Sequence, residues 1–415
     1  MITEKKISFI DYFVGFLLIG VSSIPILVGD EILIASFIFI MSIFINRRLN
    51  IESKYIYYLG IFSLLFLLVF IIYDVFKLML YLGLVLRITL GYCALRILSK
   101  NFFKVYINIL YFFALTSLIF YFSILFFPSI EAYLFDKVAA FFKTIQVSPI
   151  NRDHIGLYTL EKSSAYIYGG LKRNAGPFWE PGGFGLFLNL TLLFIILTKH
   201  KISSKKVFVI VVALLTTLST GAYLTFSLVI VFYITVKYSG NTGKLKKYFI
   251  ILTFFGFTYF SYTNFVFLQN KVTQDIIKGE SGARTRSKSM QLDFVKFLEN
   301  PITGVGLYKE TRFSKRELRD DDLMHRTSGL LALLSQFGLI GFFTFFYHMK
   351  KPIVSVLAFN RIKKNNYLFI IFIIMALGIS QSIFLKPFFL GISIGLPLVK
   401  KSISRKENYP ENLSL

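Results

Sequence analysis

Long apolar stretches alternate with short polar segments along most of the chain. About twelve of these stretches approach the length of roughly 20 residues that a helix needs to cross the hydrocarbon core of a bilayer. They lie near residues 8–28, 30–46, 55–73, 76–98, 103–127, 181–198, 205–219, 221–237, 247–266, 327–348, 366–383 and 384–399. The pattern therefore predicts an all-α integral membrane protein with about 12 transmembrane helices.

Two polar segments interrupt this alternation, and each contains apolar positions at helical spacing that predict a helix lying in the membrane interface. These positions are Ile130, Leu134, Val138, Phe141 and Ile145 in the first segment, and Met290, Phe294, Phe297 and Leu298 in the second. The expected order is transmembrane helices 1–5 in 1–127, a first loop segment in 128–180, helices 6–9 in 181–266, a large loop in 267–326, helices 10–12 in 327–401 and a polar tail in 402–415.

Basic residues concentrate in alternate connections between the predicted spans. The chain has 46 Lys and Arg against 22 Asp and Glu, a formal net charge of +24. Clusters such as Arg47, Arg48 and Lys54 follow every second span. Cytoplasmic loops of membrane proteins carry this excess, so both termini are expected in the cytoplasm and both polar segments on the opposite, periplasmic face. The same distribution argues against a nucleic-acid partner.

Cysteine and acidic residues indicate no metal or cofactor. Cys93 is the only cysteine and lies inside a predicted span, which excludes a disulfide and a cysteine-based zinc cluster. Asp320, Asp321 and Asp322 could bind a divalent cation, although an acidic run in a basic loop is usually only solvated.

The segment Arg173–Phe184 carries the first candidate chemistry and contains the only tryptophan. Its glycines and prolines at a helix entrance can leave backbone N–H groups free for an anion, and Arg173 adds a bidentate phosphate partner. Glu180, beside apolar residues at the membrane edge, could have a raised pKa suited to acid–base catalysis. A helix-entry turn with an interfacial Trp explains the same residues equally well.

Two further clusters lie in and after the second polar segment. Arg284 and Arg286 precede the predicted interfacial helix, and they either bind an anion or reach lipid headgroups. His325 and Arg326 precede a span, where a histidine could be a base, a phosphate partner or a solvated loop residue.

Two other residues are weaker candidates. His154 lies in the first polar segment. Arg87 falls in the middle of a span and should face the interior, paired with Asp74 or Asp11, either as a structural residue or on a path for lipid phosphates.

Taken in order, these clusters resemble the O-antigen polymerase and O-antigen ligase family. The resemblance covers most of the chain, and its motifs are Arg173 with Gly176 and Glu180-Pro181-Gly182, then Arg286 with Asn300-Pro301 and Gly304-Val305-Gly306, then His325 with Gly338-Leu339-Ile340-Gly341. Two departures stand out: Leu218–Ala222 lacks the arginine that many members carry there, and Arg326 follows the histidine where asparagine is usual.

The resemblance implies a GT-C-like glycosyltransferase in the bacterial inner membrane with a periplasmic active site. Its donor would be an oligosaccharide on undecaprenyl pyrophosphate, and the long first loop with the Glu-Pro-Gly form favours a polymerase that uses a second lipid-linked repeat unit as acceptor. We expect Arg173, Arg284, Arg286 and Arg326 to bind pyrophosphate, with His325 or Glu180 as base and Arg286 also stabilising the leaving group. No metal or other cofactor is expected. Membrane lipid is an expected partner, and a polysaccharide chain-length regulator would fit the same pathway.

Two alternatives share the sequence features. An O-antigen ligase would use the same fold and donor but transfer the glycan to lipid A–core. A lipid-linked oligosaccharide flippase also has about a dozen spans, but it needs charges along a central path, whereas here they gather in the loops.

Overall fold

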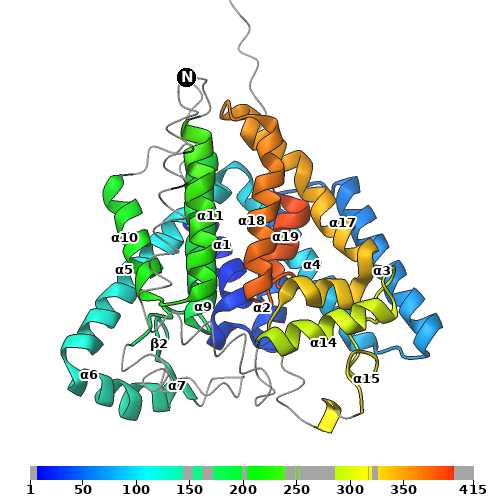
Figure 1. Cartoon of the computed structure of the whole chain (residues 1–415), viewed down its shortest axis with the longest axis horizontal. Coiled ribbons are helices and arrows are strands. Elements are labelled where there is room, and N and C mark those ends of the chain that lie inside the picture. Colours follow the sequence, from blue (N-terminus) through cyan, green and yellow to red (C-terminus); the bar gives the residue numbers. More distant parts are fainter. Residues whose placement is uncertain are drawn as a thin grey trace, which may run out of the picture.

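The computed structural model describes residues 7–143, 153–160, 172–198, 203–238, 248, 252, 286–315, 317–319 and 326–396. Nearly all of this part of the chain is helical (Figure 1). The long helices are α1 (Phe9–Ser23), α2 (Asp30–Asn46), α3 (Ser53–Tyr73), α4 (Leu78–Leu98), α5 (Phe102–Phe126), α9 (Pro181–Thr198), α10 (Ser204–Thr216), α11 (Thr220–Lys237), α14 (Arg286–Glu299), α17 (Gly329–Phe359), α18 (Tyr367–Ser380) and α19 (Pro387–Gly395).

Shorter elements belong to the two polar segments. After α5 the chain forms α6 (Pro128–Tyr133), a π-helical stretch (Leu134–Ala139) and α7 (Ala140–Lys143) in direct succession. The short helix α15 (Lys309–Arg312) follows α14. The strands β1 (Asp153–His154) and β2 (Thr159–Leu160) pair antiparallel, with Asp153 opposite Leu160 and His154 opposite Thr159. The remaining short turns are 3-10 helices at Pro25–Leu27, Ser99–Asn101, Glu317–Arg319 and Lys364–Asn366.

The predicted class, a helical multi-pass membrane protein, is confirmed. Among the described residues, five helical stretches are long and apolar enough to cross a membrane. One of them, Leu78–Phe126, contains both α4 and α5, which are 21 and 25 residues long and separated at Ser99, where φ is 43°. Several other helices are shorter than a full span, and the predicted span 247–266 lies almost wholly outside the described residues. The total of about twelve spans and the domain order stay predictions.

Polar contacts join several helix ends at one end of the bundle, here called the basic end. Asp11 at the start of α1 accepts hydrogen bonds from Arg47 after α2 (3.1 Å) and from Asn101 before α5 (3.3 Å). Arg96 near the end of α4 pairs with Glu52 before α3. The first two predicted basic connections therefore lie together.

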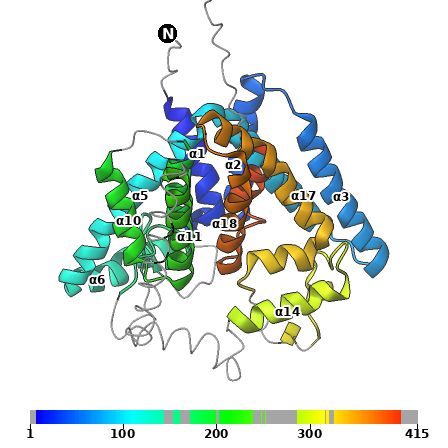
Figure 2. The ribbon, with the colours of Figure 1, turned by 45° about the horizontal axis from the view of Figure 1, so that its top comes forward.

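The described parts of the two polar segments lie at the opposite end, here called the site end. Figure 1 shows α6, α14 and α15 on one side of the bundle, and Figure 2 shows α6 and α14 on that side. Lys172 forms an ion pair with Glu131 of α6 at 2.6 Å, and Lys77 before α4 pairs with Glu310 of α15. The expectation that both segments share one face agrees with this arrangement.

Both predicted interfacial segments contain helices. In the first, Leu134 and Val138 pack against a small core that includes Tyr158, while Tyr133 and Phe141 are exposed. In α14, Phe294 and Leu298 are exposed, whereas Ser289 and Asp293 are buried against the protein. The exposed apolar side chains of α14 are available to contact the bilayer, as expected of a helix in the membrane interface.

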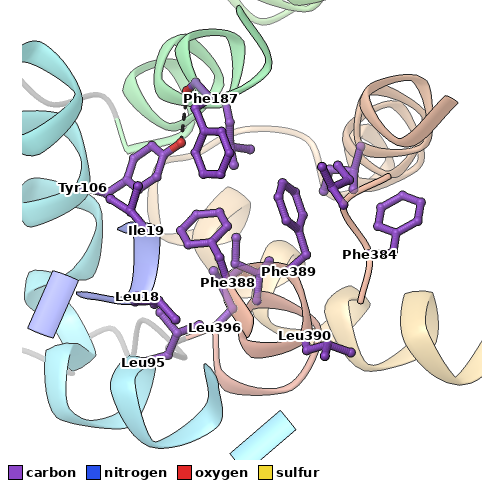
Figure 3. Close-up of a cluster of buried hydrophobic side chains, with 14 of the residues drawn as sticks. Leu18, Ile19, Leu95, Tyr106, Phe187, Phe384, Phe388, Phe389, Leu390 and Leu396 are labelled. Atoms are coloured by element: carbon purple, nitrogen blue, oxygen red, sulfur yellow. Dashed lines mark hydrogen bonds between the residues drawn. The ribbon is translucent and has the colours of Figure 1, made fainter. Parts of the chain in front are cut away.

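The core is centred on the crossing of α4 and α19. Phe388 and Phe389 of α19 contact Phe187 of α9, and the Tyr106 hydroxyl donates to the Phe187 carbonyl at 3.0 Å (Figure 3). Gly91 permits the crossing, because a Cβ there would lie 2.1 Å from the Pro387 carbonyl oxygen.

We predict that Gly91→Ala lowers the stability of the protein by about 1–3 kcal/mol, because overpacking forces a backbone shift. Gly83→Ala, two turns away on α4, is the matched control, because a Cβ there meets nothing within 4 Å. Thermal unfolding in detergent measures both. Equal melting temperatures for the two variants would contradict the close crossing.

Candidate active site

The turn before α9 is fixed by Asn174. This residue is fully buried, and its side-chain amide donates to the hydroxyls of Ser117 (3.1 Å) and Thr216 (3.0 Å) while its oxygen accepts from the Gly176 N–H (2.9 Å). Gly176 has a φ of +52°, and a Cβ there would lie 2.9 Å from the Phe184 ring. The positive φ and the close contact with Phe184 therefore explain why position 176 is a glycine.

His154 holds the same turn from the other side. Its Nδ1 accepts from the Gly156 N–H at 3.0 Å, so Nε2 carries the proton and donates to the Pro177 carbonyl at 3.1 Å. Burial lowers the pKa of His154 to about 4, although the hydrogen bond to Pro177 opposes the shift. With both nitrogens engaged, His154 is a neutral structural residue and a poor candidate for a base.

Glu180 lies immediately before α9 and contacts a residue that the sequence did not single out. Its Oε1 accepts a hydrogen bond from the side-chain amide of Gln381, in the connection between α18 and α19. A Cβ at Gly182 would lie 2.5 Å from that amide nitrogen, so a larger residue there would displace the end of the Gln381 side chain. The Gln381 carbonyl in turn accepts from the Gly329 N–H at 3.1 Å, at the start of α17.

Arg173 reaches the same region from the turn. Its Nε donates to the Thr217 carbonyl at 3.3 Å, two residues before Ser219, which caps α11 by accepting from the Ala222 N–H. The Ser219 hydroxyl is 3.4 Å from a Cβ built at Gly182. The connection before α11 thus joins Arg173 to the surroundings of Glu180.

A buried network of ion pairs ties α14 to the start of α17. Asp293 of α14 is inaccessible to solvent and lies 3.2 Å from Arg312 Nη2 and 3.3 Å from Arg326 Nε, and Arg326 also pairs with Glu317. Burial raises the pKa of Asp293 against the opposing effect of the two arginines. Burial also works to raise the pKa of Glu317, but hydrogen bonds from Ser314 and Arg326 hold it below the usual value.

This network engages Arg326 within the protein, since only 8% of the residue is exposed and its guanidinium also lies over the Phe313 ring. The predicted role of Arg326 in binding pyrophosphate is untested. Its contacts suit a residue that positions its neighbour, His325.

Other predicted residues are placed only by their backbone or not at all. Arg286 is the first residue of α14, and its side chain lies outside the described structure, as do Arg284, His325 and the run Asp320–Asp322. Position 286 shares a helix face with Ser289 and Asp293 by helical spacing. The Ser289 hydroxyl accepts from the Thr327 N–H at 2.9 Å, which anchors the start of α14 two residues from position 325.

The two glycine motifs pack against each other. Gly338, with φ 58° and ψ −164°, interrupts α17, and a Cβ there would lie 2.3 Å from the Ile302 carbonyl oxygen. The loop 300–306 fills the break, because Val305 N–H donates to the Ser335 carbonyl (2.8 Å) and Leu339 N–H to the Pro301 carbonyl (2.8 Å). These glycines therefore shape α17.

Hydrogen bonds thus bring three sequence motifs to the start of α17: Glu180 through Gln381 and Gly329, the start of α14 through Ser289, and the segment of Arg326. The N-termini of α9, α11 and α17, where the helix dipoles give a positive potential, gather here. Among the described residues no group of three or more His, Cys, Asp or Glu could hold a metal ion. Such an arrangement can bind an anion and hold a carboxylate beside it.

Fold and site define a multi-pass membrane protein with a candidate anion-binding site at one end of its helices. Residues 207–346, about one third of the chain, match the family model of O-antigen ligase. The resemblance to the O-antigen polymerase and ligase family is thereby confirmed over this part of the chain, and it supports a glycosyltransferase of ligase or polymerase type. A search of curated proteins finds no match. The matched region contains Ser219, Asp293 and Arg326, while Arg173, Glu180 and Gln381 lie outside it.

We predict that acid destabilises the protein through His154. Its folded pKa of about 4 is below the unfolded value near 6.5, so its contribution is complete above pH 6.5 and lost as pH falls through 4. The loss is on the order of 3 kcal/mol. His154→Gln should flatten the melting temperature between pH 7 and pH 4 relative to wild type, and an unchanged pH profile would contradict the buried neutral histidine.

We also predict that Asp293→Asn costs about 3–5 kcal/mol of stability, because Arg312 and Arg326 would then share one acid in a buried site. Glu310→Gln breaks an exposed ion pair and should cost less than about 1 kcal/mol. Thermal unfolding and amide exchange in α14 measure the difference. A mild effect of Asp293→Asn would show that the network does not hold α14 in place.

Proposed function

We propose that the protein polymerises oligosaccharide repeat units carried on undecaprenyl pyrophosphate, at the periplasmic face of the inner membrane. The observation that carries this proposal is the hydrogen-bonded path from Glu180 through Gln381 to Gly329, which gathers the family's separate motifs at the start of α17. The site end lies opposite the basic end, and the positive-inside rule then makes the site end periplasmic.

The proposed chemistry is a single displacement. A hydroxyl oxygen of the acceptor repeat attacks the anomeric carbon of the donor, the bond from that carbon to the diphosphate oxygen breaks, and the electron pair leaves with undecaprenyl diphosphate. Arg173, Arg284, Arg286 and the helix N-termini would stabilise the growing negative charge. Because these groups supply the positive charge, the mechanism needs no metal ion.

A base must accept the proton of the attacking hydroxyl. His325 is our first choice, because its ordinary pKa near 6.5 needs little adjustment. Glu180 is the alternative, and its hydrogen bond from Gln381 supports a positioned carboxylate. Arg326 is proposed to position His325 through its contacts with Asp293 and Glu317.

An O-antigen ligase is the second candidate, favoured by the description of the matching family model. The ligase would use the same donor and the same arginines, with lipid A–core as acceptor. A chain-length regulator as partner stays a prediction for the polymerase alone.

The test is a polymer ladder assay in a strain that lacks the gene. We predict that Arg173→Ala, Arg286→Ala, His325→Ala or Glu180→Gln, expressed at wild-type levels, fails to restore the ladder, with a turnover loss on the order of 100-fold for each arginine. Arg48→Ala is the matched control that should restore it, because Arg48 is exposed and lies at the basic end, opposite the site.

The lipid intermediates of the deleted strain separate the alternatives. Single-repeat lipopolysaccharide indicates the polymerase, and long polymer stranded on undecaprenyl pyrophosphate indicates the ligase. Lipid-linked single repeats held at the cytoplasmic face would identify a flippase and overturn the site assignment.

A further inference from the structure

Two cationic side chains outside the candidate site lie close enough to repel each other electrostatically: Arg87 of α4 and Lys386, which caps α19. The α4–α19 crossing brings them together. Gly91 packs on the backbone of Pro387 and Gly391, and Arg87 lies one turn before Gly91 on the same face of α4.

Neither cation has a partner of opposite charge in contact within the described structure. Asp30, at the exposed start of α2, is the acidic residue whose charge acts on Arg87. Asp30 and Arg87 form no direct ion pair. The expected pairing with Asp11 is wrong, because Asp11 binds Arg47 at the basic end.

The position of this pair makes its lack of a partner costly. Arg87 is nine residues from the start of α4, about 14 Å along the helix, and the hydrocarbon core is about 30 Å thick. Charged side chains at such depth normally face an opposite charge or a polar path. The N-terminus of α19 adds to the positive potential at Lys386.

The pair is connected directly to the candidate site. The segment 381–386 starts at Gln381, which binds Glu180, and ends at Lys386. Five residue steps span at most about 18 Å between the two Cα atoms. An anion at Arg87 and Lys386 would therefore lie near the reacting centre without occupying it.

We infer that Arg87 and Lys386 bind the diphosphate headgroup of a second polyisoprenoid lipid, the one that carries the acceptor. This assignment rests on the proposed polymerase function. Growth at the lipid-linked end needs two lipid diphosphates at once, and Arg173 and Arg286 serve the one that leaves. The reacting hydroxyl of the acceptor is separated from its own diphosphate by the repeat unit, so that diphosphate needs a second cationic site. Arg87 would supply a bidentate contact and Lys386 a point charge.

Native mass spectrometry of the purified chain with undecaprenyl diphosphate tests this inference. Wild type should bind two lipids, and Arg87→Gln/Lys386→Gln should weaken one of the two binding events at least about 100-fold, since two charged contacts are lost. Arg48→Gln/Lys104→Gln removes one Arg and one Lys from exposed positions and should bind like wild type. The exchange Arg87→Lys/Lys386→Arg keeps both positive charges, so it should retain binding within about tenfold.

The outcomes separate the two proposals. If wild type binds lipid diphosphate and the Gln variant binds it equally well, the second site is refuted while the polymerase function stands. If wild type binds no lipid diphosphate, both the second site and the proposed polymerase function are refuted. If inorganic diphosphate alone fills the second site and the lipid does not, the site binds a soluble anion and the lipid assignment is overturned. Without lipid, the folded Gln variant should melt no lower than wild type, because the two cations no longer repel each other; a lower melting temperature would mark them as structural.

Discussion

Because Gly338 interrupts α17, residues 329–337 run in a different direction from the rest of the helix (Figure 2) and bring its N-terminus to the candidate site. A broken helix leaves backbone groups without partners, which is tolerated at membrane depth only where other protein groups supply hydrogen bonds. The loop 300–306 provides them. The same loop follows α14, so the break, the loop and the position of Arg286 form one structural unit. The start of α17 then contacts Gln381, and through it Glu180.

Charge is distributed unevenly around this unit. Arg312 and Arg326 are balanced by Asp293 and Glu317, a set with no net charge that fixes the geometry. Within the part of the chain that the structure describes, Arg87 and Lys386 have no such balance. A protein that handles lipid diphosphates needs both kinds of arrangement: neutral networks that position residues, and uncompensated cations that bind the substrate.

Sequence patterns predicted elements better than contacts. The stretches 30–46 and 181–198 became α2 and α9 with the same bounds, because a continuous apolar run limited by Gly, Pro or charge is a local signal. The end of α17 was missed: the helix continues through Lys350 to Phe359, and Lys350 lies over the Tyr367 ring. Basic residues can remain in a helix when an aromatic face is near, which the local pattern does not reveal.

The candidate site was predictable in its parts and not in its connections. Arg173 and Glu180 stood out because they flank a Gly- and Pro-containing turn at the entrance of an apolar stretch. Gln381 did not, since a polar residue closing an apolar stretch is common, and its partner is 201 positions away. Asp293 was overlooked because α14 was judged by its apolar positions, of which the structure exposes Phe294 and Leu298. The only available clue was the spacing of Arg286, Ser289 and Asp293 along one helix face.

The most direct test of the central claim is to give the purified chain in liposomes a lipid-linked repeat unit as its sole substrate and identify the products by mass spectrometry. The account predicts a lipid-linked dimer together with one free undecaprenyl diphosphate for each glycosidic bond formed. Transfer that begins only after lipid A–core is added, or release of undecaprenyl diphosphate without a new glycosidic bond, would contradict it.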